Sequence, residues 1–252
     1  MDMHHNEGDC GSILEYAPDD ATPAPVRGRL RQRRSFYDEI DRATIERVNL
    51  RQIKAIIFDF GNVLLEWDPR YVYQRFFPND PEGMERFLDE VKFMEWNLHQ
   101  DKGRPFAEGV ALLSRDFPHY SDLIQAYHDH WIDSLGESLA GTVEILKELK
   151  QAGYPVFGLS NWSAETFPTA RKKHDFFDLL DDMVISGEVG HVKPHPEIFQ
   201  IMLDKIGRPA QECLFIDDAQ ANIEQAQKMG FATIHFQSPD QLRLALHELG
   251  IL

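Results

Sequence analysis

The sequence predicts an α/β fold, a doubly wound parallel β-sheet with a helical module inserted after its first strand. The apolar run AIIF at 55–58 ends at Asp59 and suits a strand buried on both faces of such a sheet. From 67 to 141, apolar residues recur at three- and four-residue spacing, which is typical of helices. After 141, short apolar runs alternate with helical segments. This alternation implies right-handed crossovers and a parallel sheet covered on both faces.

The chain divides into three parts. Residues 1–50 include acidic, histidine-containing and proline-containing segments, and we expect a disordered tail plus a short helix that begins at Ser35. Residues 51–66 and 142–252 form the predicted α/β core. Residues 67–141 form the helical module, which would lie above the strand ends, where it could act as a lid.

Composition excludes several classes of protein. The formal net charge of −16 argues against a nucleic-acid groove, because phosphate backbones require clustered Lys and Arg. No apolar stretch approaches the length of a membrane span, and the N-terminus lacks the pattern of a signal peptide. We therefore expect a cytoplasmic monomer or homodimer. The second of the two cysteines, Cys213, lies in an apolar run and is predicted to be a buried thiol.

The elements follow from periodicity and from Pro and Gly positions. Within the module, Pro81 and Pro105 stand where helices begin. No alternating strand pattern interrupts this block, so we expect helices alone there. The predicted helical segments of the module are 69–77, 81–100, 104–117 and 121–135. The elements predicted after it are helix 142–151, strand 154–160, helix 163–174, strand 181–186, helix 196–206, strand 212–217, helix 219–229, strand 231–236 and helix 238–249.

Polar side chains stand where several of these strands end or in a loop before a helix. Since the carboxyl ends of parallel strands share one edge of the sheet, we expect these side chains to converge on Asp59. Each has a simpler explanation when taken alone, as a helix cap or a surface charge, but their joint arrangement indicates a site. The residues are Ser160, Asn161, Lys193, Asp217 and Asp218.

Clustered carboxylates repel each other unless a cation holds them together. Hard oxygen ligands favour Mg²⁺ over zinc, and the sequence has no Cys/His cluster that suggests otherwise. A carboxylate beside Mg²⁺, with a hydroxyl and an ammonium directed at the same point, suits phosphoryl transfer. Asp59 as the nucleophile would give an aspartyl-phosphate that water then hydrolyses.

Four segments resemble the signatures of the haloacid dehalogenase-like hydrolase superfamily, in the family's order: DFGNVL, LSNWS, VKPHPEIF and FIDDAQANIEQA. They fall between Ile53 and Gly230, and the resemblance extends to the C-terminus. The resemblance implies a Rossmann-like core, with the inserted helices as the family's cap. It further implies a phosphatase that acts on a small phosphorylated metabolite.

The same resemblance assigns roles to individual residues. Asp59 would be the nucleophile and a Mg²⁺ ligand, and Lys193 would balance the charge of the phosphoryl group. Ser160 and Asn161 would hold that group. The metal site would be completed by the backbone carbonyl of Gly61 and by Asp218, with Asp217 as a supporting carboxylate; which of these two carboxylates binds the metal directly stays open.

One departure from the family pattern matters. Phosphatases of this family usually have a second Asp two positions after the nucleophile as general acid and base, and here that position is Gly61. The DxGNV pattern, with SN and IDDxxxNI, most resembles a subgroup that includes bacterial α-D-glucose-1-phosphate phosphatases. It therefore suggests an anomeric sugar 1-phosphate. Gly61 could instead serve only the backbone of the turn, with an acid supplied by the cap.

Two rival functions remain open. One is a metal-free 2-haloacid dehalogenase, in which Asp59 attacks carbon; the Asp217–Asp218 pair argues against it. The other is a non-catalytic protein that binds a phosphorylated ligand on the same fold. The module residues that we expect nearest the site are Trp96, His99, Gln100 and Asp101.

Overall fold

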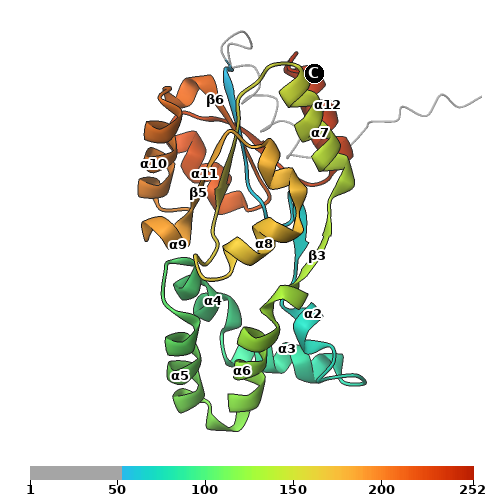
Figure 1. Ribbon diagram of the computed structural model, residues 1–252, viewed down its shortest axis with the longest axis vertical. Helices are drawn as coiled ribbons and strands as arrows, with labels where there is room; N and C mark the ends of the chain where they lie inside the picture. The colour runs from blue at the N-terminus through green and yellow to red at the C-terminus, as the bar shows by residue number, and fades with distance from the viewer. Residues whose placement is uncertain (1–52) are drawn as a thin grey trace, which may run out of the picture.

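The computed structural model describes residues 53–252, so the predicted tail and the helix from Ser35 lie outside the described residues. The described chain forms an α/β core with a group of helices packed at one end of its sheet (Figure 1). None of the helices in 53–252 is both long and apolar enough to cross a membrane.

The core is built on a five-stranded sheet in which every strand is parallel to its neighbours, in the order β5-β4-β1-β6-β7. The first strand occupies the centre, where Ile57 pairs with Phe157 on one side and Phe215 on the other. The carboxyl ends of β4, β1 and β6 therefore lie side by side, as expected from the sequence. The strands are β1 (Ala55–Phe58), β4 (Val156–Ser160), β5 (Asp182–Ile185), β6 (Cys213–Asp217) and β7 (Ala232–His235).

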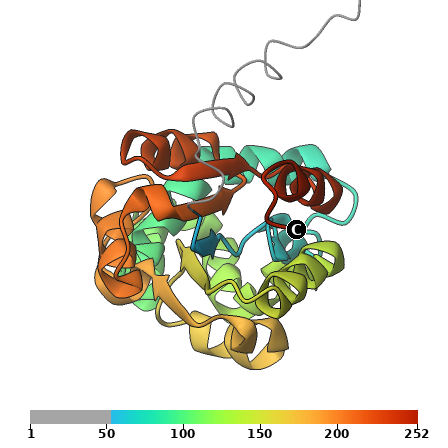
Figure 2. The same ribbon diagram turned by 90° about the horizontal axis from the view of Figure 1, so that it is seen from above.

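Helices cover both faces of this sheet, which confirms the doubly wound fold (Figure 2). Side chains of β1 alternate between the faces: Ile56 and Phe58 pack towards α7, α8 and α12, whereas Ala55 and Ile57 pack towards α10 and α11. All four are fully buried, as the unbroken apolar run predicts. Cys213 is also a buried free thiol. The helices are α7 (Ala140–Gln151), α8 (Phe167–Lys173), α9 (Ser186–Val189), α10 (Pro196–Ile206), α11 (Gln220–Lys228) and α12 (Pro239–Glu248), with 3₁₀ turns at Asp175–Leu179 and Ala210–Glu212.

The inserted helices have a hydrophobic core of their own, rich in aromatic side chains. Tyr127 lies at its centre, with its ring centroid 4.7 Å from that of Phe93 in an edge-to-face contact. The helix that starts at Pro81 is capped by Asp80, which accepts a hydrogen bond of 2.8 Å from the backbone N–H of Gly83. The helices are α2 (Arg70–Tyr73), α3 (Pro81–Glu90), α4 (Phe93–Asp101), α5 (Phe106–Asp116) and α6 (Ser121–His130), with 3₁₀ turns at Pro118–Tyr120 and Trp131–Ser134.

The expectation that this block contains helices alone is wrong. A two-stranded antiparallel ribbon, β2 (Leu65–Trp67) and β3 (Leu135–Ser138), carries the chain into and out of the helices. The helix predicted over 121–135 correspondingly ends at His130. Strands of three and four residues are too short for alternation to be recognised in sequence. They form because the two ends of the insertion must come together at the core.

A second correction concerns the helix predicted over 163–174. The structure starts α8 at Phe167, with Pro168 in its first turn, and residues 164–166 form turns. Proline is tolerated in a first turn but not in a helix interior, so Pro168 sets the start of this helix. The short helix α9 was not predicted. By contrast, α10 spans the predicted residues 196–206.

The carboxyl end of α4 joins the inserted helices to the core. The hydroxyl of Ser186, at the start of α9, donates a hydrogen bond to the backbone carbonyl of Asp101. The Asp101 carboxylate accepts a hydrogen bond of 3.0 Å from the side chain of Asn97. Burial raises the pKa of Asp101 to about 7, although a hydrogen bond from the backbone of Ser163 acts in the opposite direction.

This raised pKa predicts a pH-dependent gain in stability for Asp101→Asn. Between about pH 4 and 7 the unfolded chain releases the Asp101 proton while the folded chain keeps it, so wild-type stability falls across that window. A penalty of about 1–2 kcal/mol would raise the Tm of the variant over wild type by roughly 2–8 °C at pH 8, and by almost nothing near pH 4. Thermal unfolding at both pH values measures this difference. Asp129→Asn, at an exposed position of α6, is the control. An equal difference at both pH values would contradict the assignment.

Candidate active site

The loop after β1 holds Asp59 at the edge of the sheet. Its backbone N–H donates to the carbonyl of Ile216 on β6 at 2.9 Å, and its Oδ1 accepts from the N–H of Phe60 at 2.7 Å. The Phe60 ring is fully buried and packs so closely on Gly158 of β4 that a Cβ there would lie 2.2 Å from the ring. Sheet pairing and this aromatic anchor together fix the position of the Asp59 carboxylate.

The turn that follows depends on Asn62 rather than on Gly61. Asn62 has φ = 56°, in the left-handed region that Asn tolerates better than most residues. Gly61 is not in that region, and a Cβ added to it would meet nothing nearer than the Cβ of Trp67 at 3.9 Å. The structure therefore gives no backbone or steric reason for glycine at position 61.

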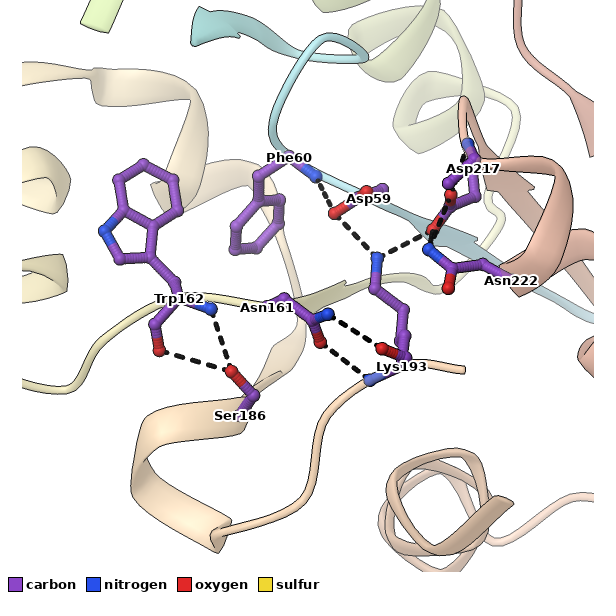
Figure 3. Close-up of polar contacts among 9 residues, drawn as sticks. Asp59, Phe60, Asn161, Trp162, Ser186, Lys193, Asp217 and Asn222 are labelled. Atoms are coloured by element: carbon purple, nitrogen blue, oxygen red, sulfur yellow. Dashed lines mark hydrogen bonds and ion pairs between the residues drawn. The ribbon is translucent and has the colours of Figure 1, made fainter. Parts of the chain in front are cut away.

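A buried lysine bridges two carboxylates at the centre of the site (Figure 3). The ammonium Nζ of Lys193 lies 2.9 Å from Asp59 Oδ1 and 2.7 Å from Asp217 Oδ2, and its side chain is 1% exposed. It also lies 5.6 Å from the centroid of the Phe215 ring. Lys193 comes from the loop before α10, so this contact joins the ends of β1 and β6 to a third segment of the chain.

The adjacent acids Asp217 and Asp218 differ in environment. Asp217 is fully buried, and both of its oxygens accept hydrogen bonds from the side chain of Asn222, at 2.9 and 3.0 Å. Its Oδ1 also accepts from the N–H of Ala219 at 2.8 Å. Asp218 is less buried and lines the cavity described below, whereas Asp217 does not. Of these two acids, Asp218 is thus the one that lies at the cavity.

Burial and mutual repulsion shape the pKa values of these groups. Burial raises the pKa of Asp59 to about 7, although Lys193 opposes the rise. Burial and the charge of Asp217 also raise the pKa of Asp218. For Lys193, burial favours the neutral amine, but the charges of Asp217 and Asp59 outweigh it and leave the pKa above its ordinary value. The ammonium group of Lys193 is thus one positive charge among three carboxyl groups.

Ser160 and Asn161 both lie at the cavity, and Asn161 has a role that the sequence did not reveal. The Asn161 side chain accepts from the backbone N–H of Lys193 at 2.7 Å and donates to the Lys193 carbonyl at 3.0 Å. This pair of hydrogen bonds fixes the loop that carries the lysine. Ser160 ends β4 and is 2% exposed, and both residues line the same cavity as Asp59.

Two further residues support the site and carry no role in the predictions from sequence. Asn222, which binds both oxygens of Asp217, stands on the first turn of α11 five residues after that strand end; this spacing was the available signal. Ser186 accepts a hydrogen bond of 2.8 Å from the N–H of Trp162, beside Asn161, but it follows β5 without any motif (Figure 3).

Asp59 and Asp218 line a cavity of about 290 Å³ between the core and the inserted helices. It brings together every site residue predicted from the sequence except Asp217. Of the four module residues expected nearest the site, Asp101 lines the cavity. Trp96 and Gln100 are buried and bonded within the module, where the Trp96 indole donates to the Gly109 carbonyl and Gln100 donates to the Trp96 carbonyl. His99 is exposed and does not line the cavity.

The donor set fits a hard divalent cation. Asp59, Asp217 and Asp218 each offer an oxygen within 4.8 Å of the others, and Lys193 is the one cationic side chain among the described residues that line the cavity. Oxygen ligands of this kind suit Mg²⁺, whereas a stable zinc site would call for Cys or His. The buried negative charge therefore matches what a divalent cation would neutralise.

Similar proteins include two phosphatases by name. D-ribitol-5-phosphate phosphatase of Bacteroides thetaiotaomicron is 26% identical over 190 residues, which cover 72% of this chain and 90% of that protein. Pyrophosphatase PpaX of Bacillus cereus is 33% identical over 188 residues, or 72% of this chain and 82% of PpaX. Drimenol cyclase drtB of Aspergillus calidoustus is 25% identical over 198 residues, 77% of this chain. The chain spans only 36% of the length of that relative.

Solved structures share the fold. A HAD family enzyme from Bacteroides thetaiotaomicron, in complex with magnesium and inorganic phosphate, gives a TM-score of 0.56 at 26% identity and covers 74% of this chain and 95% of that chain. L-2-haloacid dehalogenase from Xanthobacter autotrophicus, with chloropropionic acid covalently bound, gives 0.53 at 20% identity, with 79% and 84% coverage; this likeness shows the fold alone.

The family assignment comes from the sequence as a whole. The family model described as haloacid dehalogenase-like hydrolase matches residues 53–230, well over half of the chain and all four of its signatures. The two named phosphatases each match 72% of the chain, at 26% and 33% identity. The chain is therefore an enzyme of the haloacid dehalogenase-like hydrolase family, with phosphatases among its relatives.

Proposed function

We propose that the protein is a Mg²⁺-dependent phosphatase that hydrolyses small phosphomonoesters through an aspartyl-phosphate on Asp59. The observation that carries this proposal is the meeting of Asp59, Asp217 and Asp218 with the buried ammonium of Lys193 at the end of one cavity. Buried carboxylates that only stabilised the fold would have their charge met by cations or by hydrogen bonds. Here the surplus negative charge faces the cavity through Asp218.

The proposed reaction has two displacements at phosphorus. In the first, a carboxylate oxygen of Asp59 forms a bond to phosphorus while the bond from phosphorus to the ester oxygen breaks, and the leaving group departs as an alkoxide or aryloxide that takes its proton from water. In the second, water attacks the same phosphorus, the Asp59–phosphorus bond breaks, and inorganic phosphate leaves with the carboxylate restored. The contact of the buried Asp59 carboxylate with Lys193 keeps that carboxylate in place at the cavity.

The neighbouring residues supply charge and position. Lys193 balances the phosphoryl oxygens, and Ser160 and the backbone N–H of Asn161 hold them. Asp59, Asp218 and the backbone carbonyl of Gly61 would hold Mg²⁺, which, when bound, offsets the negative charge of the phosphoryl group. Asp217 supports Lys193 rather than the metal, because its oxygens already accept four hydrogen bonds and ion-pair contacts.

The inserted helices act as a cap in this proposal, with 51–66 and 142–252 as the catalytic core and 67–141 as the cap. The ribbon of β2 and β3 provides the connection between them. The cavity lies at this boundary and takes lining residues from both parts, which supports a role for the cap in binding the leaving group. The names of the two phosphatase relatives support the reaction class.

Two alternative functions can be distinguished from the proposed phosphatase by experiment. A metal-free 2-haloacid dehalogenase would have no use for the carboxylate of Asp218 facing the cavity. A non-catalytic binding protein would not need a nucleophile held in place by Phe60 and Ile216. Halide release from 2-chloropropionate would support the first rival. Stabilisation by phosphorylated ligands without any turnover would support the second.

The residue at position 61 narrows the range of substrates that we propose. Glycine there leaves the nucleophile loop without a carboxylic acid to protonate the departing oxygen, and the backbone does not require glycine. Leaving groups that tolerate negative charge need such an acid least. We therefore propose a preference for aryl, acyl or anomeric phosphates over simple alkyl ones, and an anomeric sugar 1-phosphate belongs to this group.

The function is tested by phosphate release from a panel of phosphomonoesters, with Mg²⁺ and with excess chelator. We expect turnover only with the metal, and Asp59→Asn should lower kcat by at least about a thousandfold without unfolding the protein, because the nucleophile is lost. Trapping with beryllium fluoride and Mg²⁺ should likewise require Asp59. Turnover by the variant above a few per cent of wild type would rule out the aspartyl-phosphate.

Gly61→Asp tests whether an acid is missing. Its Cβ fits the loop, so the added carboxyl should raise kcat for alkyl phosphates about tenfold or more, and should flatten the dependence of kcat on leaving-group pKa. Saturation kinetics on a series of substituted phenyl and alkyl phosphates measures that slope.

Gly61→Ala is the matched control for this series, since it adds the Cβ without the acid and should keep the steep wild-type slope. A flat slope in the wild-type enzyme would contradict the proposal. It would assign the proton to a cap residue, and Asp101 is the carboxyl that lines the cavity from that side.

A further inference from the structure

The residues that the inserted helices and the β2–β3 ribbon contribute to the cavity are mostly apolar. These apolar side chains come from the β2–β3 ribbon, from α4 and α5, and from the 3₁₀ turn after α6. We call these six residues the apolar wall: Trp67, Met94, Leu98, Phe106, Trp131 and Leu135. The carboxylates and Lys193 occupy the core end of the same cavity, so the site has a charged end and an apolar end.

Two members of the apolar wall are not explained by packing within the protein. Met94 and Leu98 stand one turn apart on α4 and are 61% and 40% exposed, whereas Phe93 and Trp96 of the same helix are buried in the core of the cap. Residues four apart lie on one face of a helix, so both point away from that core and towards the cavity. Exposed apolar side chains gathered at a cavity indicate contact with a ligand.

The polar groups beside the apolar wall are partly engaged within the protein. On the cap side, Asn97 donates to Asp101 at 3.0 Å, and on the core side the Thr166 hydroxyl accepts from the indole of Trp162 at 3.1 Å. A sugar placed here would leave several hydroxyls without partners against aromatic side chains, which is costly. Lys193, the one cationic side chain among the described lining residues, already contacts two carboxylates, so a second phosphate would find no free cation there.

We propose that the substrate is the monophosphate of an apolar alcohol or phenol, whose hydrocarbon part, such as an aromatic ring, binds the apolar wall. This inference rests on the proposed phosphatase function and favours the aryl phosphates within the leaving groups argued above over a sugar 1-phosphate. The cavity of about 290 Å³ stands at the lower end of small-ligand pockets, roughly 300–1,000 Å³, and suits a leaving group of one or two rings.

The test compares kcat/KM for four substrates in two pairs. Phenyl phosphate and glucose 1-phosphate form the pair with leaving groups that tolerate charge, and benzyl phosphate and glycerol 3-phosphate form the pair with alkyl leaving groups. We expect the apolar member to exceed the polar member at least tenfold within each pair, since each buried methylene contributes about fourfold to affinity. A preference present in both pairs separates apolar binding from leaving-group pKa.

Substitutions in the apolar wall test whether the preference for apolar substrates arises from these residues. Leu98→Gln and Met94→Gln should each lower kcat/KM for phenyl and benzyl phosphate about three- to tenfold, mainly through KM, and should change glycerol 3-phosphate less than twofold. Leu112→Gln and Leu244→Gln are matched controls. These leucines are 37% and 61% exposed and do not line the cavity, so all four substrates should behave as with wild type.

The outcomes separate this inference from the proposed function. Faster turnover of the sugar or glycerol phosphate, with Leu98→Gln indistinguishable from Leu112→Gln, would overturn the apolar substrate and leave the phosphatase intact. If no phosphomonoester is hydrolysed, the proposed function fails. The wall is then tested by calorimetric titration with benzylphosphonate and methylphosphonate in the presence of Mg²⁺. Binding of benzylphosphonate at least tenfold tighter supports the wall, and equal binding refutes it.

Discussion

The site depends on the buried contact of Lys193 with Asp59 and Asp217. Three charged groups are withdrawn from water here, and removal of one partner from such a buried pair typically costs about 3–5 kcal/mol, because the remaining charge is left without compensation. The arrangement is possible because the parallel sheet places the ends of β1 and β6 side by side. The side chain of Asn161, at the end of β4, then holds both backbone groups of Lys193, so three neighbouring strands fix one ammonium.

Much of the core could be predicted from sequence because its signals are local. The fully apolar β1, the alternation of strands and helices after residue 141, and the start of α10 at Pro196 each carry a pattern within one short window. The convergence of Asp59 and Asp218 followed from parallel topology, whereas Lys193 stands in the loop before α10 and is held there by Asn161. The elements that the sequence did not predict depend on pairing partners that are distant in the chain. The pairing of Leu65 with Ser138 is such a case. Strands this short leave no periodic pattern.

The cap was predicted as helical, but its cavity-facing residues could not be selected from sequence. The helix α4 has apolar side chains on more than one face, with Phe93 and Trp96 in the cap core and Met94 and Leu98 at the cavity. A sequence pattern cannot say which of two apolar faces packs inside the cap. Similarly, His99 and Asp101 are two residues apart and point in different directions on the helix, and only packing against the core decides that Asp101 reaches the cavity.

The charged end and the apolar end of the cavity each favour a different property of a ligand. The glycine at position 61 connects these two preferences. Asn62 takes the left-handed conformation that the turn requires, so the glycine before it is free to vary as far as the backbone is concerned. Its lack of a side chain therefore bears on the proposed reaction, in which the nucleophile loop contributes no proton and the alcohol leaves with little help. An aryl leaving group meets that demand through its low pKa, and the same ring buries apolar surface against Met94 and Leu98. One property of the ligand thus satisfies both ends of the site, whereas a sugar 1-phosphate would satisfy the charged end alone.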